Sequence, residues 1–321
     1  MTTLATLASL VSLIGGTQFW INVGLLAAIF GIFTVGLQLN VGYTGLYNFA
    51  QAGFMAVGAY AMALLVLKAH LSFWLALPIA AGVSVCFALV VGIPSLRLRG
   101  DYFAIASIAF SETILYAIQN ASFTGGEEGL LGYTTSWQTL STRMMSALGL
   151  PSQDFLVPIL IVSWAIFLLV VAFVWLLTKT PWGRVLRAIR EDEDACRALG
   201  KRVVVYKLQS LSVAAILASI AGYLLALDLG YLSPEEFTPD NTFIAFTMLL
   251  VGGLGSFAGV VVGAVFIEVI LETTRNVIDI PLSDSHLAAL RFIVVGAVLV
   301  VIVLLRPQGL LGKRDEMRFR R

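Results

Sequence analysis

The first 67 residues of this chain contain no Lys, Arg, Asp or Glu. A soluble domain carries roughly 25% charged residues, because its surface must face water. Over all 321 residues only 12% are charged and 59% are hydrophobic, and the mean hydropathy is +0.93. Much of the surface is therefore expected to face a lipid bilayer, which restricts the chain to very few folds.

Long apolar segments recur along the chain, each sufficient to cross a hydrocarbon core about 30 Å thick as a helix of roughly 20 residues. Leu, Ala, Ile, Val and Gly dominate them, without the short alternation typical of a membrane barrel. The fold is therefore predicted to be all-α, a polytopic membrane helical bundle. We expect membrane segments near residues 18–39, 46–67, 73–95, 102–119, 155–177, 207–228, 242–271 and 288–305.

The uneven distribution of basic residues predicts an orientation. Eight of the twenty lie in Thr178–Lys207 and six in the tail Arg306–Arg321, so both segments are expected to be cytoplasmic. Acidic residues outnumber basic ones in Asn120–Asp154 and Asp228–Asp240, which are expected to be external. One transmembrane domain over residues 1–321 follows, with the side of the N-terminus left open; the resemblance described below implies that it lies in the plasma (inner) membrane.

Helix parity conflicts with this orientation unless the segment 242–271 enters the membrane and returns on the same side. Two simple crossings there would place the basic tail outside. Gly252, Gly253 and Gly255 lie in the sequence VGGLGS, and glycine is a natural position for a break in a membrane helix. We therefore predict a re-entrant pair or a broken helix in this segment.

Two glycine patterns have more than one interpretation. Gly255, Gly259 and Gly263 form two overlapping G-x-x-x-G spacings on one helix face, either for close packing or along a pore. The segments 40–60 and 251–266 each contain G-L-x-x-F followed by VGA. An internal repeat and a chance similarity explain that likeness equally well.

Two acidic residues, Glu112 and Glu268, fall inside predicted membrane helices. An ionisable group at membrane depth is a functional hypothesis by default. The candidate partners are Arg291 or polar groups such as Asn48 and Gln51. A structural ion pair or hydrogen-bonded lock is favoured over direct contact with a substrate.

The basic segment contains Asp194-Ala195-Cys196, followed three residues later by Gly200. This spacing resembles the EAA-xxx-G signature of the permeases of ATP-binding-cassette (ABC) importers. A short helix that ends at a glycine can present one face to a docked partner, and Gly200 would supply the left-handed turn that stops it. A generic basic loop that obeys the positive-inside rule is the alternative.

Seven segments in order resemble the LivM-type permease of branched-chain amino acid ABC importers and together cover nearly the whole chain. They are GYTGLYNFAQAGFMAVGAY (42–60), SLRLRGDYFAIASIAF (95–110), TGGEEGL (124–130), TPWGRVLRAIREDEDACRALG (180–200), YLSPEEFTP (231–239), LLVGGLGSFAGVVVGA (249–264) and LRPQGLLG (305–312). The family usually has small or polar residues after TGG, where this chain has Glu127 and Glu128.

This resemblance implies a heterodimer with a paralogous permease, two cytoplasmic ATPase subunits, and an external solute-binding protein that delivers branched-chain amino acids. The chain is not expected to be an enzyme, because it contains no G-x-x-x-x-G-K-[ST] phosphate-binding loop. No cofactor, metal site or nucleic-acid partner is expected.

Two sets of candidate residues follow from the resemblance and the patterns. The set expected to couple the chain to the ATPases is Arg190, Glu193, Asp194, Ala195, Cys196 and Gly200. The set expected to line or gate the translocation path is Asn48, Gln51, Glu112, Gly125, Gly126, Gly252, Gly253, Gly255 and Ser256.

Functions of other classes are also consistent with an apolar helical bundle. An ion-coupled secondary transporter of a small polar solute would use Glu112 and Glu268 as ion sites. A membrane-embedded enzyme is disfavoured, because the sequence has no metal-spaced His/Asp/Glu cluster and no G-x-S-x-G turn. A receptor or scaffold would leave the glycine-rich breaks unexplained.

Overall fold

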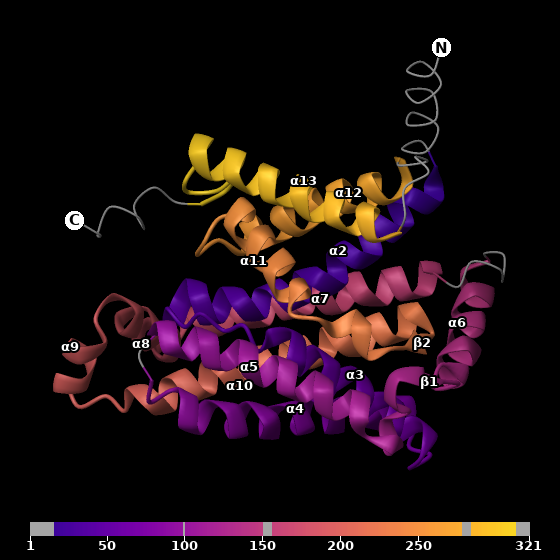
Figure 1. Cartoon of the computed structure of the whole chain (residues 1–321), viewed down its shortest axis with the longest axis horizontal. Helices are drawn as coiled ribbons and strands as arrows, with labels where there is room; N and C mark the ends of the chain where they lie inside the picture. The colour runs from indigo at the N-terminus through magenta and orange to yellow at the C-terminus, as the bar shows by residue number, and fades with distance from the viewer. Residues whose placement is uncertain (1–15, 99, 150–155, 278–283, 313–321) are drawn as a thin grey trace.

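The computed structural model describes residues 16–98, 100–149, 156–277 and 284–312, and most of them are helical (Figure 1). The α-helices are α2 (Thr17–Leu37), α3 (Gln51–Leu67), α4 (Phe73–Ser95), α5 (Gly100–Asn120), α6 (Thr135–Leu148), α7 (Leu156–Lys179), α8 (Pro181–Glu191), α9 (Glu193–Ala198), α10 (Val203–Leu229), α11 (Asp240–Gly252), α12 (Phe257–Val277) and α13 (Asp284–Leu305). Six helices in the described ranges are long and apolar enough to cross a membrane. The predicted helical membrane bundle is confirmed.

Short elements connect the helices. They are the π-helical turn η1 (Gln38–Thr44), the 3-10 turns η2 (Ser122–Thr124), η3 (Gly126–Glu128) and η4 (Pro234–Phe237), and the strands β1 (Leu130–Leu131) and β2 (Tyr231–Leu232). The two strands pair antiparallel and join the connections that follow α5 and α10.

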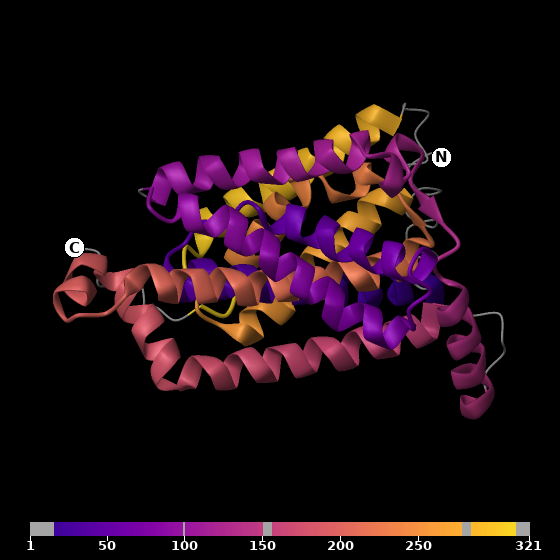
Figure 2. The same cartoon turned by 90° about the horizontal axis from the view of Figure 1, so that it is seen from below.

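The core of the bundle is formed by α2, α3 and α10. The most apolar part of α10 is 78% buried, whereas that of α7 is 28% buried. Figure 2 shows the rose-coloured α7 along one edge of the bundle. Its outward side chains Leu168, Leu169 and Phe173 are exposed, as expected of a helix that faces lipid.

The helices end at two opposite ends of the molecule (Figure 1). At one end lie α8 and α9, the end of α4 and the start of α10; at the other lie α6 and the two strands. The Tyr133 hydroxyl, just before α6, donates to the Ala226 carbonyl oxygen at 2.7 Å. Burial raises the pKa of Tyr133, which keeps this donor protonated.

Helix α6 lies within the segment Asn120–Asp154, for which the sequence analysis expected only an external loop. Trp137 and Met145 are buried along one side, while Gln138 and Thr142 are exposed on the other. The helix is too short and too polar to cross a bilayer, so a search for long apolar runs misses it.

Candidate functional site

The chain leaves the α-helical path between α2 and α3, and residues 38–50 are called the first break. The π-helical turn η1 is followed by Gly45, whose φ of +71° is left-handed. Regular secondary structure then stops until α3 begins at Gln51. Along this stretch Leu46 and Asn48 are buried, whereas Tyr47 is 45% exposed. Irregular backbone at membrane depth requires partners within the protein or a water-filled cavity.

Asn48 and Gln51 fasten the end of the first break to the core. The Asn48 side-chain amide donates to the Gln51 side-chain oxygen at 3.0 Å. Gln51 in turn donates to the carbonyl oxygens of Phe33 at 3.3 Å and Ala214 at 3.2 Å. Both amides have no exposed surface. Both side chains therefore point into the protein and hold the end of the first break against the core.

Hydroxyl groups of neighbouring helices supply further partners. The hydroxyls of Thr44 and Ser210 lie 2.8 Å apart, which joins the π-helical turn to α10. The Ser107 hydroxyl on α5 accepts from the Phe49 amide at 2.9 Å. The Thr242 hydroxyl on α11 accepts from the amide of Ala52 at 3.1 Å. Each partner is far away in the sequence, so the bundle has to assemble before the first break is held.

A second break, residues 253–256, separates α11 from α12 and confirms the predicted broken helix. Gly253 and Gly255 have left-handed φ angles of +113° and +82°. Gly252 packs on Gly259, and Gly263 packs on the Met248 carbonyl. The two helices therefore form an antiparallel hairpin whose backbones touch.

The expected row of three glycines on one helix face is wrong at its first position. Gly255 lies in the break itself, because α12 begins only at Phe257. Gly259 and Gly263 lie in α12 and pack closely against α11, as the packing interpretation requires. The Ser256 hydroxyl accepts from the Gly259 amide at 3.1 Å and so caps the start of α12.

The segment after α13 forms hydrogen bonds with the backbone at the second break. The amides of Leu310 and Leu311 donate to the carbonyl oxygens of Val251 and Gly252 at 2.8 and 3.0 Å. A side chain at Gly253 would collide with the backbone of this segment. The LRPQGLLG motif therefore provides donors for the carbonyls at the end of α11.

The two breaks touch each other. The Tyr43 and Phe257 rings are stacked, with centroids 5.7 Å apart. The Gln38 amide, oriented to meet both donors, accepts from the amides of Gly255 and Ser256 at 2.7 and 2.9 Å. The sequence placed these segments more than 200 residues apart. Only the packing of α2 against α12 brings them together.

The short helices α8 and α9 lie next to the first break. Arg190 of α8 donates to the Gly42 carbonyl oxygen, and a Cβ atom at Gly45 would lie 3.2 Å from the Arg190 Cγ. The Arg187 guanidinium lies over the Tyr43 ring, 4.8 Å from its centroid. Helix α8 therefore contacts the unwound part of the α2–α3 connection directly.

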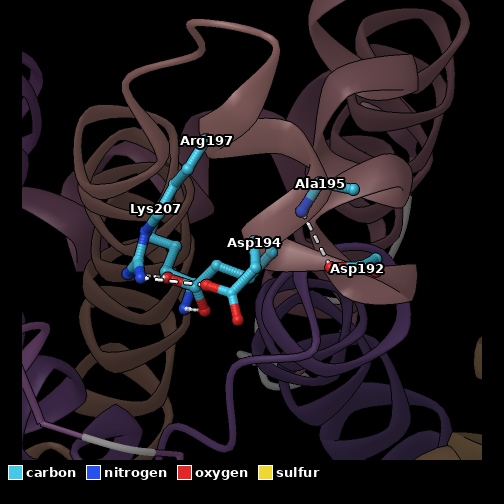
Figure 3. A network of polar contacts seen from close by, with 6 residues as sticks. Asp192, Asp194, Ala195, Arg197 and Lys207 are labelled. Carbon is cyan, nitrogen blue, oxygen red and sulfur yellow. Dashed lines mark hydrogen bonds and ion pairs between the residues drawn. The ribbon is translucent and has the colours of Figure 1, made fainter.

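Helix α9 contains four of the predicted coupling residues, Glu193 to Cys196, and an ion-pair network lies around its start (Figure 3). Asp192 accepts from the Ala195 amide at 2.9 Å and begins the helix. The Glu193 carboxylate pairs with Arg197 at 2.6 Å and with Lys207 of α10 at 2.5 Å. Gly200 follows the helix with a φ of +76°, so the expected left-handed turn is present.

Of the remaining coupling candidates, Cys196 is buried, and Asp194 is exposed with a 3.3 Å contact to Arg197. Cys196 packs with Ile189 and Val203, which joins α9 to its two neighbours. Ala195 is exposed. Helix α9 is thus fixed to α8 and α10, and its exposed surface contains the acidic Asp194, the basic Arg197 and the small Ala195.

Residues 19–303 match the sequence model of a protein family, the permease component of branched-chain amino acid transport systems. This chain belongs to that family. The permease is 32% identical over 307 residues to the high-affinity branched-chain amino acid transport system permease protein LivM of Salmonella typhimurium, covering 91% of this chain and 69% of that protein.

More distant relatives share shorter parts of the permease. A probable branched-chain amino acid transport permease protein LivM of Methanocaldococcus jannaschii is 30% identical over 231 residues, which is 69% of this chain and 63% of that protein. The autoinducer 2 import system permease protein LsrC of Escherichia coli is 30% identical over 121 residues, 36% and 35% of the two chains. No solved structure matches the permease significantly.

Glu112 lies apart from the two breaks, on α5 of the permease. It is half-buried, beside the exposed side chains of Thr113 and Tyr116. Asn48 and Gln51 are occupied by each other and the core. Among the described residues no ion pair joins Glu112 or Glu268 to Arg291, so the expected lock is wrong for these groups.

Gly125 lies between η2 and η3, and Gly126 begins η3, at the opposite end from α8; their φ angles are +82° and +59°. The Tyr231 hydroxyl donates to the Glu128 carbonyl oxygen at 2.9 Å. Together with the strand pair, this bond fixes the TGGEEGL loop to the α10–α11 connection. The loop is thus a rigid part of that end of the permease.

The sequence analysis named Arg190 only as a coupling candidate; it missed the contact of Arg190 with the first break and the roles of Arg187, Tyr43 and Gln38. In the sequence, Arg187 is one basic residue of a basic segment, and Tyr43 is one aromatic residue of an apolar segment. A weak signal did exist, since Gly42 and Gly45 are glycines with polar neighbours in a predicted membrane segment. Nothing in the sequence paired them with α8.

Proposed function

We propose that this chain is the substrate-translocating permease subunit of an ABC importer for branched-chain amino acids. It would work in the inner membrane with a paralogous permease, two ATPases and an external solute-binding protein. The observation that carries the proposal is the position of α8 and α9. A short helix with the D-A-C-xxx-G spacing adjoins α8, which contacts the first break through Arg190.

By the positive-inside rule, the basic residues of α8 and α9 support a cytoplasmic position for their end of the molecule, and the basic tail is proposed to be cytoplasmic as well. Thr17 and α6 belong to the opposite, external end. The TGGEEGL loop and the α10–α11 connection would then meet the binding protein. A surface that is ordered before contact binds at a lower entropic cost, and the strand pair that joins these two loops supports that role.

The translocation path is proposed to run along α5 and the first break. Helix α5 is the least apolar of the six candidate spans, and its outer face carries Tyr102, Glu112 and Thr113. A charged group is unfavourable toward lipid, which supports a second permease on this face. Phe49, in ring contact with Phe243 and Phe246, would supply apolar surface for an aliphatic side chain.

ATP binding would close the ATPases and displace α8 and α9, and the two breaks would then change the access of the path. Gly252, Gly253, Gly255 and Ser256 would act as the hinge of the α11–α12 hairpin. Asn48 and Gln51 would hold the first break during that change. Hydrolysis is supplied by the partner subunits, since the chain has no phosphate-binding loop.

The test is ATP hydrolysis and leucine uptake by the four-component complex in liposomes. Hydrolysis that rises only with both binding protein and leucine is the expected result. Uptake that proceeds without ATPases and collapses with an ionophore would replace the proposal with the ion-coupled alternative. Asp194→Ala and Gly200→Val should separate hydrolysis from uptake, and unchanged uptake in both would contradict the coupling role.

A further inference from the structure

Helix α8 lies beside the first break, and one of its side chains also bonds the backbone of the break. Arg190 reaches the Gly42 carbonyl oxygen inside the π-helical turn, and its side chain lies against Gly45. Gly42 is buried. A carbonyl near the end of a helical segment carries partial negative charge and lacks a regular helical partner. A guanidinium is well suited to such an oxygen, because it is always charged and has several donors.

The glycine at position 45 makes this approach possible. Its φ of +71° is disfavoured for other residues, and a side chain there would crowd the Arg190 stem. The GYTG sequence thus combines a carbonyl for the guanidinium with an open surface for the rest of the arginine.

The contact continues from the first break into the second. Arg187 lies over the Tyr43 ring, and that ring also stacks with Phe257, the first residue of α12. Gln38 bonds the backbone of Gly255 and Ser256. A continuous series of contacts therefore runs from α8 through the π-helical turn to the hinge between α11 and α12.

Space for movement lies beside the contact. A cavity of about 210 Å³ is bordered by Gly45, Leu46, Phe103, Arg190 and Lys207. The cavity is partly open to the surroundings, so the side chains that border it are less closely packed than those of the core.

We infer that Arg190 is a positioning residue that joins α8 to the first break, and that Tyr43 and Gln38 carry this link on to the second break, so that the two breaks move as one body. Its role in transport rests on the proposed function, since the movement of α8 would come from the ATPases. The mechanical link itself does not depend on the substrate or on the partners.

Hydrogen exchange on the full chain in lipid nanodiscs tests the link. Arg190→Met keeps the aliphatic stem and removes the guanidinium. Loss of a charge-assisted hydrogen bond should raise amide exchange about tenfold or more in both 42–50 and 253–257. Arg190→Lys should restore part of the protection. Arg184→Met is the matched control, because Arg184 is exposed on the same helix and has no side-chain bond to described residues.

Amides in the middle of α10 report whether each variant is folded, and they should exchange as in the wild type. A rise confined to 42–50, or no rise in either segment, would overturn the inference. Tyr43→Leu provides a second test that leaves Arg190 in place. It should raise exchange at 253–257 by several-fold, and unchanged exchange there would show that the link does not pass through the Tyr43–Phe257 stack.

The reconstituted complex allows a second measurement, the amount of substrate transported per ATP hydrolysed. This ratio should not change if Arg190 only stabilises the fold. Arg190→Met should lower the amount of substrate transported per ATP hydrolysed by at least several-fold, while Arg190→Lys recovers much of it. An unchanged ratio in the Met variant would contradict the positioning role. The exchange experiment is separate from this one, so a failure of the importer proposal would not be mistaken for a failure of the link.

Discussion

The two breaks of this permease share the sequence G-L-x-x-F, yet they are held in different ways. Gly45 and Gly253 both have left-handed φ angles, and a helix resumes shortly after each. The first break is fastened by side chains, including those of Asn48, Gln51 and Thr242. The second is fastened largely by backbone contacts.

The difference shows two solutions to one physical requirement. Peptide groups within a membrane must be bonded inside the protein. Around the first break, α5, α10 and α11 present hydroxyls that can accept or donate. Around the second break, glycines allow another main chain to come close enough to donate directly. Side-chain fastening should therefore tolerate changes in volume, whereas backbone fastening should not.

The largest loss of stability is expected at Gly253, where the close backbone contact of the second break leaves no room for a side chain. Gly253→Ala would combine backbone strain of about 1–3 kcal/mol with overpacking of about 1–3 kcal/mol against the segment after α13. Thermal unfolding in detergent, followed by tryptophan fluorescence, should show a strong loss of stability.

Gly230→Ala is the matched control for this change. Gly230 also has a left-handed φ, of +67°, but a Cβ atom there would meet nothing within 4 Å. Only strain of about 1–2 kcal/mol should remain. Equal losses in the two variants would show that close backbone contact does not hold the second break.

The second-largest loss of stability is expected from the buried side-chain amide of Gln51, which follows the first break. Gln51→Leu preserves approximate volume but leaves the Asn48 amide without its acceptor. We expect a loss of about 2–3 kcal/mol in the free energy of unfolding. Gln209→Leu is the control, because Gln209 is exposed and accepts only from the Trp182 indole. A loss in the control as large as that in Gln51→Leu would show that the buried Asn48–Gln51 bond does not stabilise the first break.

A smaller effect is expected where α11 meets α3. Thr242→Val removes the acceptor of the Ala52 amide without changing the side-chain shape. The cost should be about 1–2 kcal/mol. Thr247→Val, on the same helix, removes only a bond to the Phe243 carbonyl within α11. If the two variants unfold at the same temperature, the hydroxyl at position 242 does not fasten the break.

The smallest effect is expected away from both breaks. Arg197→Ala removes exposed contacts to Glu193 and Asp194. Exposed pairs of this kind contribute about 0.5 kcal/mol or less, so the unfolding transition should barely move. A shift comparable to that of Gln51→Leu would mean that α9 is part of the stable core.

Much of the fold could be predicted, because the bilayer imposes a strong constraint on sequence. The apolar runs at 73–95 and 155–177 agree closely with α4 and α7. The break after Gly252 followed from helix parity and glycine content. Helix α6 escaped prediction, since an amphipathic helix outside the core of the bilayer leaves no long apolar run.

The candidate site was predicted less completely. Glycines and short motifs are local signals, and they identified Gly200 and Gly253 as turns. The contact of Arg190 with Gly42 joins residues 148 positions apart. No periodicity or spacing reports such a pair, because many carbonyls are equally available to an arginine until the helices have packed.

The sequence by itself determined that the chain is a membrane helical bundle with a basic end and a glycine-broken hairpin. These properties follow from local composition, since lipid excludes charge and unbonded backbone from every position that it contacts. Only the tertiary structure decided that α2 also unwinds, that the two breaks touch, and that α8 contacts the first through Arg190. Those features arise from side chains brought together across the bundle, so their energies exist only once the helices are assembled.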